Sequence, residues 1–154
     1  MEAATATVRA RTRVAVVRPD EMRVALDRAL AAADADERIG PRLRATGLAM
    51  RFDLPDAGIT LHVRAAADDD DAHNIQWSFD KDPGWQPKLV LEMSAAVANR
   101  YLQWAQSLAV AIARGQVRSR GESRAALSYL PAARLICQPY RRVVEADFPD
   151  LVAA

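Results

Sequence analysis

The chain has 154 residues, of which 51% are hydrophobic and 27% charged, and its formal net charge is +1. These values are typical of one globular domain, and the small net charge excludes a strong long-range attraction to nucleic acid or to a membrane. A single cysteine, Cys137, excludes an internal disulfide and fits a reducing compartment.

Residues 1–18 are predicted to form a flexible arm or an edge strand. Arginines stand at positions 9, 11 and 13, but only the four apolar residues 14–17 follow them, too few for the apolar core of a signal peptide. No stretch approaches the roughly 18 uninterrupted apolar residues of a membrane span. The composition, rich in Ala and Arg with few lysines, resembles that of a GC-rich bacterium. We therefore expect a cytoplasmic bacterial protein without stable membrane insertion.

A helix is predicted to begin at Pro19 and Asp20. Its apolar residues, among them Met22, Leu26 and Leu30, recur at helical spacing up to the acidic run at 34–37. The Gly-Pro pair at 40–41 is then expected to break the chain.

Four strands are predicted next, because apolar and polar residues alternate through each segment. This alternation indicates a sheet with one buried and one solvated face. The segment 55–58 is a hairpin turn, the acidic run 68–71 is a solvated connection, and a weaker fifth strand surrounds Val117. The four segments are residues 48–54, 58–64, 74–80 and 88–93.

The segment 89–121 carries the strongest functional signal. A strand leads to Ser94, a helix N-cap, and one long helix is predicted from there to Gly115, its C-terminal cap. An amphipathic surface helix needs an apolar arc of about 100°, and this helix exceeds that arc. Part of its surface is therefore expected to face a cavity for an apolar ligand. The apolar positions are Val97, Tyr101, Leu102, Trp104, Leu108, Val110 and Ile112.

Two helical segments are predicted at the C-terminus. The first covers residues 122–130 and ends at Pro131; the second covers 132–148 and is interrupted by Pro139. Taken in order, the elements indicate an α+β fold with helices on one face of a mainly antiparallel sheet.

Enzyme and metal motifs are absent from the sequence. Nucleophile-elbow, phosphate-loop, dinucleotide and zinc-protease patterns are missing, and two histidines with one cysteine argue against a zinc site. We therefore predict neither a metal nor a cofactor. His62 is expected to be exposed on the polar face of its strand, and His73 to belong to a solvated acidic turn.

A cluster of arginines marks the C-terminal third. It is interpreted mainly as a solvated basic face, with an anionic headgroup, a carboxylate or an acidic protein as alternative partners. Nucleic acid is not predicted, because interleaved aromatic residues and a binding motif are missing. The cluster consists of Arg114, Arg118, Arg120, Arg124, Arg134, Arg141 and Arg142.

The order of these elements resembles the sterol carrier protein 2 (SCP2) family. The matching pieces are LVLEMS (89–94), ARGQVRSRGES (113–123) and RAALSYLP (124–131). The resemblance implies a five-stranded sheet, helices on one face, an apolar tunnel between the layers and ligand binding without catalysis.

The sequence departs from the family pattern in two places. WAQSL (104–108) replaces the family's Gly-Lys-x-Asn-Pro element, which leaves one continuous helix or a soft break near Ser107. Residues 132–154 add an extension that plugs the tunnel or docks a partner.

The resulting prediction is an arm (1–18), an SCP2-like lipid-binding domain (19–131) and a helical extension packed on it (132–154). The leading function is non-catalytic carriage of a lipid, fatty acyl or polyketide-like molecule. Two alternatives remain: an enzyme that orients an apolar substrate for cyclisation or isomerisation, with His62 or Glu92 turned inward, and a protein-interaction module or homodimer. The predicted ligand-binding residues are Phe52, Leu61, Trp77, Phe79, Leu91, Leu102, Trp104, Leu108, Ile112, Leu127 and Leu130.

Overall fold

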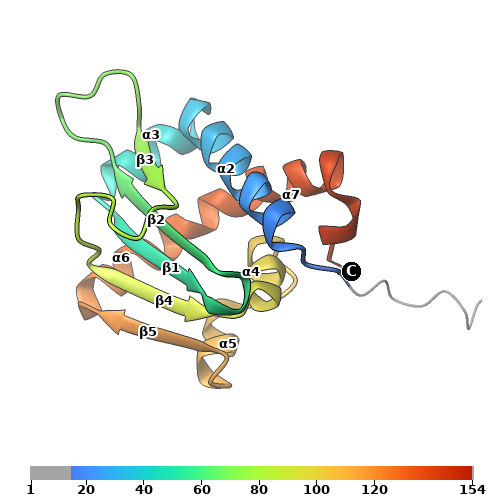
Figure 1. The fold of residues 1–154 in the computed structure, drawn as a ribbon. Helices are drawn as coiled ribbons and strands as arrows, with labels where there is room; N and C mark the ends of the chain where they lie inside the picture. Colours follow the sequence, from blue (N-terminus) through green and yellow to red (C-terminus); the bar gives the residue numbers. More distant parts are fainter. Residues whose placement is uncertain (1–14, 154) are drawn as a thin grey trace, which may run out of the picture.

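Five strands form one mixed sheet in the order β3-β2-β1-β4-β5 (Figure 1). The structure is a computed structural model and describes residues 15–153. β1 pairs in parallel with β4, and the other neighbouring pairs are antiparallel. The predicted α+β class with a mainly antiparallel sheet is therefore confirmed. The strands are β1 (Ala49–Leu54), β2 (Ile59–Ala65), β3 (Ile75–Ser78), β4 (Leu89–Met93) and β5 (Val117–Gly121).

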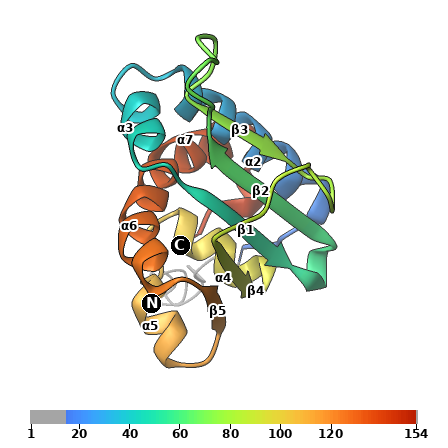
Figure 2. The ribbon, with the colours of Figure 1, turned by 90° about the vertical axis from the view of Figure 1, so that its left-hand side faces the viewer.

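One face of the sheet is covered by helices (Figures 1 and 2). Phe52 of β1 stands opposite Leu61 of β2 and Leu91 of β4, so all three side chains project toward the same face. Because side chains alternate along a strand, the polar residues between them project toward the opposite, outer face. The helices are α2 (Pro19–Ala35), α3 (Ile39–Ala45), α4 (Ala95–Leu102), α5 (Leu108–Ala113), α6 (Ser123–Ala133) and α7 (Cys137–Asp147).

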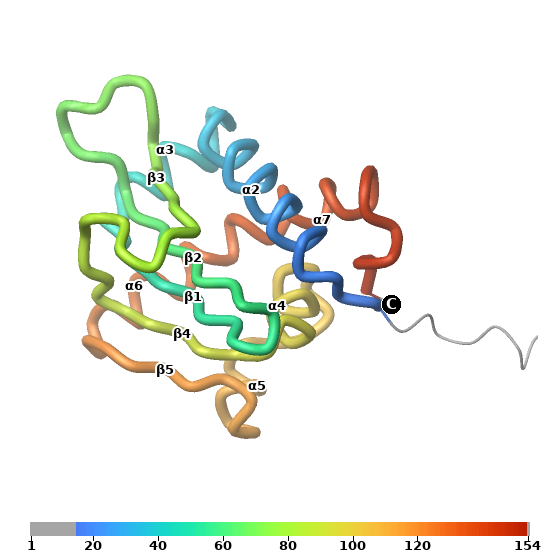
Figure 3. The backbone as a smooth tube through the Cα atoms, in the orientation of Figure 1, coloured from blue at the N-terminus to red at the C-terminus, as the bar shows by residue number. Residues whose placement is uncertain are grey.

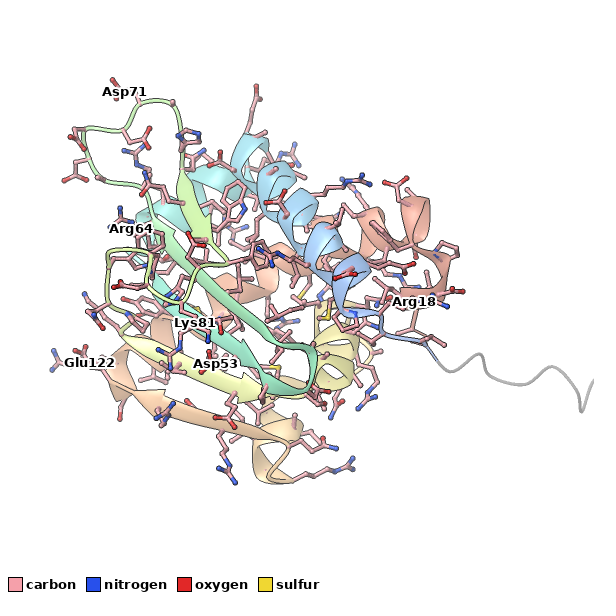
Figure 4. The ribbon with its side chains drawn as sticks, in the orientation of Figure 1. Arg18, Asp53, Arg64, Asp71, Lys81 and Glu122 are labelled. Carbon is pink, nitrogen blue, oxygen red and sulfur yellow. The ribbon has the colours of Figure 1, made fainter. Side chains whose placement is uncertain are left out.

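The outer face of the sheet is partly covered by the loop 79–88. Figure 3 traces this loop from β3 back toward the start of β4, in front of β2 and β1. His62 lies beneath it with 2% of its surface exposed, and its ring meets the Trp85 ring edge-on with centroids 6.2 Å apart. The guanidinium of Arg64, labelled in Figure 4, lies 4.2 Å from the Trp85 ring centroid. The prediction of an exposed His62 is wrong, because the loop folds over its strand.

The Gly40-Pro41 pair does not break the chain as predicted, because both residues lie inside α3. The Asp36 carboxylate accepts hydrogen bonds from the Arg38 and Ile39 amides, at 2.8 and 2.9 Å, and so caps the helix start. Proline is tolerated in a first turn, where its missing N–H would have had no helical partner. A glycine is required at position 40, because a Cβ there would lie 2.7 Å from the Asp34 carbonyl oxygen.

The predicted boundaries of the last helices are also wrong. Helix α6 continues through Pro131 to Ala133, because a proline in the last turn deletes one hydrogen bond without reversing the chain. Pro139 does not interrupt a helix either. It lies in the first turn of α7, which begins at Cys137, a position compatible with proline.

A buried polar network holds the C-terminal segment against α4. The Gln103 amide group donates to the Leu151 carbonyl and to the Asn99 side-chain oxygen, both at 2.8 Å, and its oxygen accepts from the Ala153 amide at 2.8 Å. The Tyr140 hydroxyl of α7 donates to the same Asn99 oxygen at 2.8 Å. These bonds satisfy polar groups that would otherwise be buried without partners.

The predicted N-terminal arm lies mostly outside the described residues. At its end, the Val16 amide donates to the Asp150 carbonyl at 2.8 Å, and the Arg18 guanidinium pairs with the Asp150 carboxylate at 2.7 Å. Within residues 15–153, no helix has the length and apolar character needed to cross a bilayer.

Candidate functional site

The long helix predicted from Ser94 to Gly115 is broken into α4 and α5, which is the alternative that the SCP2 resemblance left open near Ser107. Two serines act as separate N-caps: the Ser94 hydroxyl accepts from the Val97 amide at 3.1 Å, and the Ser107 hydroxyl accepts from the Val110 amide at 3.4 Å. Each serine satisfies amide groups that begin a helix. A turn at residues 103–107 therefore separates the two helices.

Trp104 occupies a strained position in this turn. Its φ of 59° is the one positive value found for a non-glycine residue within residues 15–153. The Trp104 amide donates to the Tyr101 carbonyl at 3.0 Å and the Ala105 amide to the Arg100 carbonyl at 2.9 Å, the pattern of a Schellman helix end, where glycine is usual. An L-residue in this conformation costs about 1–2 kcal/mol. The strained residue presents an indole with 56% of its surface exposed.

A groove of about 640 Å³ opens between this turn, α5 and α6. Its volume lies within the range of about 300–1,000 Å³ that is usual for small-molecule sites. Most of its walls are apolar, and its charged member is Arg134. The α5–α6 groove is lined by Tyr101, Trp104, Gln106, Ser107, Leu108, Ala109, Ile112, Leu130, Pro131 and Arg134.

A second hollow lies in the interior, between the sheet, α2 and α4. Its volume is about 30 Å³, which leaves room for a few water molecules at most. It is closed to a lipid in this conformation, unlike the tunnel that the resemblance implies. The interior cavity is lined by Met22, Leu26, Leu30, Phe52, Leu54, Leu61, Val63, Ala98, Tyr101, Leu102, Ala133 and Ile136.

Tyr101 is common to both linings. Its side chain is 6% exposed, and its hydroxyl has no hydrogen-bond partner in the described part of the chain. Burial raises the pKa of Tyr101 above its ordinary value, and the nearby Cys137 thiol adds to this effect. The phenol therefore stays protonated, and its buried hydroxyl retains an unused hydrogen-bond donor and acceptor.

Seven of the predicted ligand-binding residues border one of these two hollows. Sequence reasoning did not select Tyr101 for the lining, nor the α2 residues of the cavity. The apolar stripe of α2 was visible, but its contact with the cavity depends on how α2 packs on the sheet. Phe52, Leu61 and Leu102 line the interior cavity, and Trp104, Leu108, Ile112 and Leu130 line the groove.

Four predicted residues lie outside both linings. Leu91 is fully buried in the core. The indole N–H of Trp77 donates to the Asp27 carboxylate of α2 at 2.9 Å, and the ring of Phe79 lies 4.9 Å from the guanidinium carbon of Arg23, also on α2. Leu127 projects into solvent with 80% of its surface exposed.

The predicted acid–base candidates belong to the outer face of the sheet. Burial lowers the pKa of His62, and the neighbouring Arg51 lowers it further; both ring nitrogens lack a hydrogen-bond partner among residues 15–153. Glu92 borders a shallow hollow of about 520 Å³ together with Arg51, Asp53 and Lys81. Figure 4 labels Asp53 and Lys81 on this side. Neither His62 nor Glu92 lines the α5–α6 groove.

Several solved SCP2 domains are similar to this structure. The sterol carrier protein domain 2 of Helicoverpa armigera matches with 12% identity and a TM-score of 0.54, over 75% of this chain and 87% of that one. The apo form of sterol carrier protein 2 from Yarrowia lipolytica matches with 13% identity and a TM-score of 0.52, over 68% of this chain and 90% of that one. The chain therefore has the fold of SCP2 domains, as its sequence predicted.

A larger protein matches over a smaller part of its length. The stereoselective inverting sec-alkylsulfatase Pisa1 from Pseudomonas sp. matches 67% of this chain with 11% identity and a TM-score of 0.49, but the chain spans 15% of that enzyme. A likeness at this level carries no functional argument. No protein-family model and no curated protein sequence matches the chain.

Proposed function

We propose that this protein binds and carries a hydrophobic small molecule of the lipid class in the α5–α6 groove. The observation that carries the proposal is the groove itself, which offers about 640 Å³ of mostly apolar space beside the unpartnered hydroxyl of Tyr101. Solved structures of the same fold are named sterol carrier proteins, which supports a lipid or sterol as the class of ligand.

Apolar burial alone supplies useful affinity in such a groove. Each buried methylene contributes about 0.8 kcal/mol, so a chain segment of about eight methylenes contributes about 6 kcal/mol before the entropic cost of association is subtracted. The interior cavity of about 30 Å³ does not hold such a chain. The groove is therefore the entry position, and deeper insertion requires the Tyr101 ring to move.

Tyr101 supplies the polar contact in this proposal. A buried hydroxyl without a partner costs about 1–3 kcal/mol, and a ligand oxygen that accepts or donates a hydrogen bond there removes this cost. The preferred ligand is consequently an amphiphile with an oxygen atom that reaches Tyr101, and Arg134 of the lining favours an anionic end.

The enzyme hypothesis receives no support from this groove. Its titratable lining residues are Tyr101 and Arg134, and the pKa of Tyr101 is raised, which opposes its use as a base. The predicted acid–base candidates lie on the outer face of the sheet.

A groove-filling substitution tests the proposal. Ala109 is exposed and lines the groove, so Ala109→Trp fills the hollow without deleting a buried contact. Ala96 is exposed on α4 and lines neither hollow, so Ala96→Trp adds the same ring elsewhere. The probe is undecanoic acid with a terminal dansyl group, titrated by fluorescence.

We expect Ala109→Trp to weaken binding of this probe at least tenfold, whereas Ala96→Trp binds it as the unaltered protein does. Absence of binding by the unaltered protein contradicts the proposal. If Ala109→Trp and Ala96→Trp bind the probe equally well, the α5–α6 groove is not the binding site. Native mass spectrometry of freshly purified protein then identifies any lipid that co-purifies.

A further inference from the structure

The loop 79–88 is attached to the sheet through the Trp85 side chain rather than through its backbone. No backbone–backbone hydrogen bond joins residues 81–87 to the rest of the described chain. Trp85 packs against two side chains of β2: its ring meets the His62 ring edge-on, with centroids 6.2 Å apart, and its centroid lies 4.2 Å from the Arg64 guanidinium carbon. A segment with so few bonds to its neighbours opens locally at a lower free-energy cost than the core does.

The imidazole of His62 is buried beneath this loop without a polar partner. The residue is 2% exposed, and neither ring nitrogen has a hydrogen-bond partner among residues 15–153. The indole N–H of Trp85 is buried without a partner as well. Each of these groups lowers the stability of the closed loop, because water would satisfy it in an open one.

The charged groups around His62 come from β1, β2 and the loop. Arg51 of β1 stands opposite His62 in the register of the sheet, and Arg64 of β2 lies on the Trp85 ring that covers it. Burial lowers the pKa of His62 and Arg51 lowers it further, and these two effects prevail over the groups that favour a charged ring. Ser78, the cross-strand neighbour in β3, carries no charge. The groups that favour the charged ring are Asp53, Asp82 and the backbone of Lys81.

A proton on His62 therefore shifts the equilibrium of the loop. The closed loop gives neither ring nitrogen a hydrogen-bond partner, whereas in an open form water solvates the charged ring and its pKa returns to about 6.5. Because the closed form binds the proton less tightly, acid favours the open form. Below pH 6.5, the ratio of open to closed molecules rises about tenfold per pH unit until the closed form is protonated too.

The same loop forms one wall of the hollow on the outer face. Lys81 lines this hollow of about 520 Å³ from the loop, and Arg51, Asp53 and Glu92 line it from β1 and β4. Figure 4 labels Lys81 and Asp53, which belong to the two opposing walls. Movement of the loop consequently changes the width of the hollow and the access of solutes to the charged side chains of the sheet.

We propose that the loop 79–88 is a lid on the outer face of the sheet, which is closed while His62 is neutral and shifts toward an open form when His62 is protonated. Trp85 holds the lid closed, and Lys81 moves with it at the edge of the hollow. The proposal goes beyond the carriage of a lipid and does not depend on it, since no residue of the loop lines the α5–α6 groove.

Hydrogen exchange of the tryptophan indoles tests the lid on the full chain. The chain has three tryptophans, and the variant Trp85→Phe identifies the indole signal of Trp85 by NMR. Exchange of the buried Trp85 N–H requires the lid to open. Trp104, 56% exposed, gives the reference rate at each pH in the same sample. The backbone amide of Leu91, in the core strand β4, reports unfolding of the whole domain.

From about pH 7.5 to about pH 5.5, we expect the exchange rate of Trp85 relative to Trp104 to rise, by up to about tenfold per pH unit below pH 6.5. The protection of the Leu91 amide should change much less. His62→Phe and His62→Gln cannot take up the proton, so each should reduce the rise to less than about twofold per pH unit. His73→Gln is the matched control, because His73 is the other histidine of the chain and is exposed; it should keep the full rise.

Three results overturn this inference. The first is a ratio of the Trp85 and Trp104 rates that stays constant across the pH range. The second is an undiminished rise in the His62 variants, of which His62→Gln decides the matter if the larger ring of His62→Phe prevents folding. The third is an equal loss of protection at the Leu91 amide, which would mean that acid unfolds the domain instead of opening the lid.

Discussion

Replacing Trp104 by alanine and by glycine separates the role of its ring from the strain of its backbone. Both variants remove the indole, and they differ only in one Cβ atom at a residue with φ of 59°. A Cβ in this conformation costs about 1–2 kcal/mol, and the greater freedom of glycine in the unfolded chain offsets about 0.4–1 kcal/mol of that difference. We therefore expect Trp104→Gly to be more stable than Trp104→Ala by about 0.5–1 kcal/mol.

Urea unfolding at constant pH measures this difference, and calorimetry should show a melting temperature about 1–4 °C higher for the glycine variant. Ala105→Gly is the control, because Ala105 follows directly and has no positive φ; there glycine should lower the free energy of unfolding. If Trp104→Gly is no more stable than Trp104→Ala, the backbone of Trp104 is not strained.

The same pair of variants tests the ligand assignment. The indole lines the groove, so both should bind dansyl undecanoate several-fold more weakly than the unaltered protein and about equally to each other. A loss of affinity that follows stability instead, larger in the alanine variant, would mean that Trp104 acts through the fold.

Three further predictions concern buried polar groups. Tyr101→Phe removes a hydroxyl without a partner. The free energy of unfolding of the ligand-free protein should therefore stay equal or rise by up to about 1 kcal/mol. A loss of more than about 1 kcal/mol in urea unfolding contradicts this. Gln103→Ala leaves the buried Ala153 amide without an acceptor, whereas the Leu151 carbonyl keeps its hydrogen bond from the Asn99 side chain. The substitution should therefore cost about 1–3 kcal/mol and speed hydrogen exchange at residues 148–153, and unchanged exchange would refute the network. Burial lowers the pKa of His62 below 6.5, so the unfolded chain binds more protons than the folded chain in mild acid. The free energy of unfolding should therefore fall from pH 7 to pH 5. His62→Gln should reduce this pH dependence, and an unchanged dependence would show that other groups cause it.

The sheet was predictable because its strands alternate so regularly. The apolar set of β1, β2, β3 and β4 faces the helices, as the period of two requires. The burial of His62, by contrast, was not predictable from this pattern. Alternation tells which face of a sheet a residue occupies, but the loop 79–88 that buries His62 has no periodicity and carries its covering residue, Trp85, at a position that only the fold defines.

The helix break also illustrates what local signals settle. Ser107 is of the same N-cap residue type as Ser94, and both cap a helix, so a second helix start was visible in the sequence. The helix-stop signal of Pro131 was misleading, because a proline near a helix end still permits the last turn.

The candidate site was only partly predictable. Leu127 and Leu130 lie one turn apart on α6, yet Leu130 lines the groove and Leu127 is exposed. Spacing along a helix identifies an apolar arc, but the direction of that arc depends on how α6 packs against its neighbours. A hollow is a property of packing between elements distant in sequence, so its lining follows from the fold.

Paramagnetic broadening by a spin-labelled fatty acid locates the ligand most directly. Stearic acid with a nitroxide near its methyl end is added to isotope-labelled protein, and amide signals are compared before and after reduction of the nitroxide. Ligand carriage in the α5–α6 groove predicts selective broadening at Ile112 and Leu130 and none at Val90 of the outer face. Broadening centred on the outer face, or none at saturating fatty acid, would contradict it.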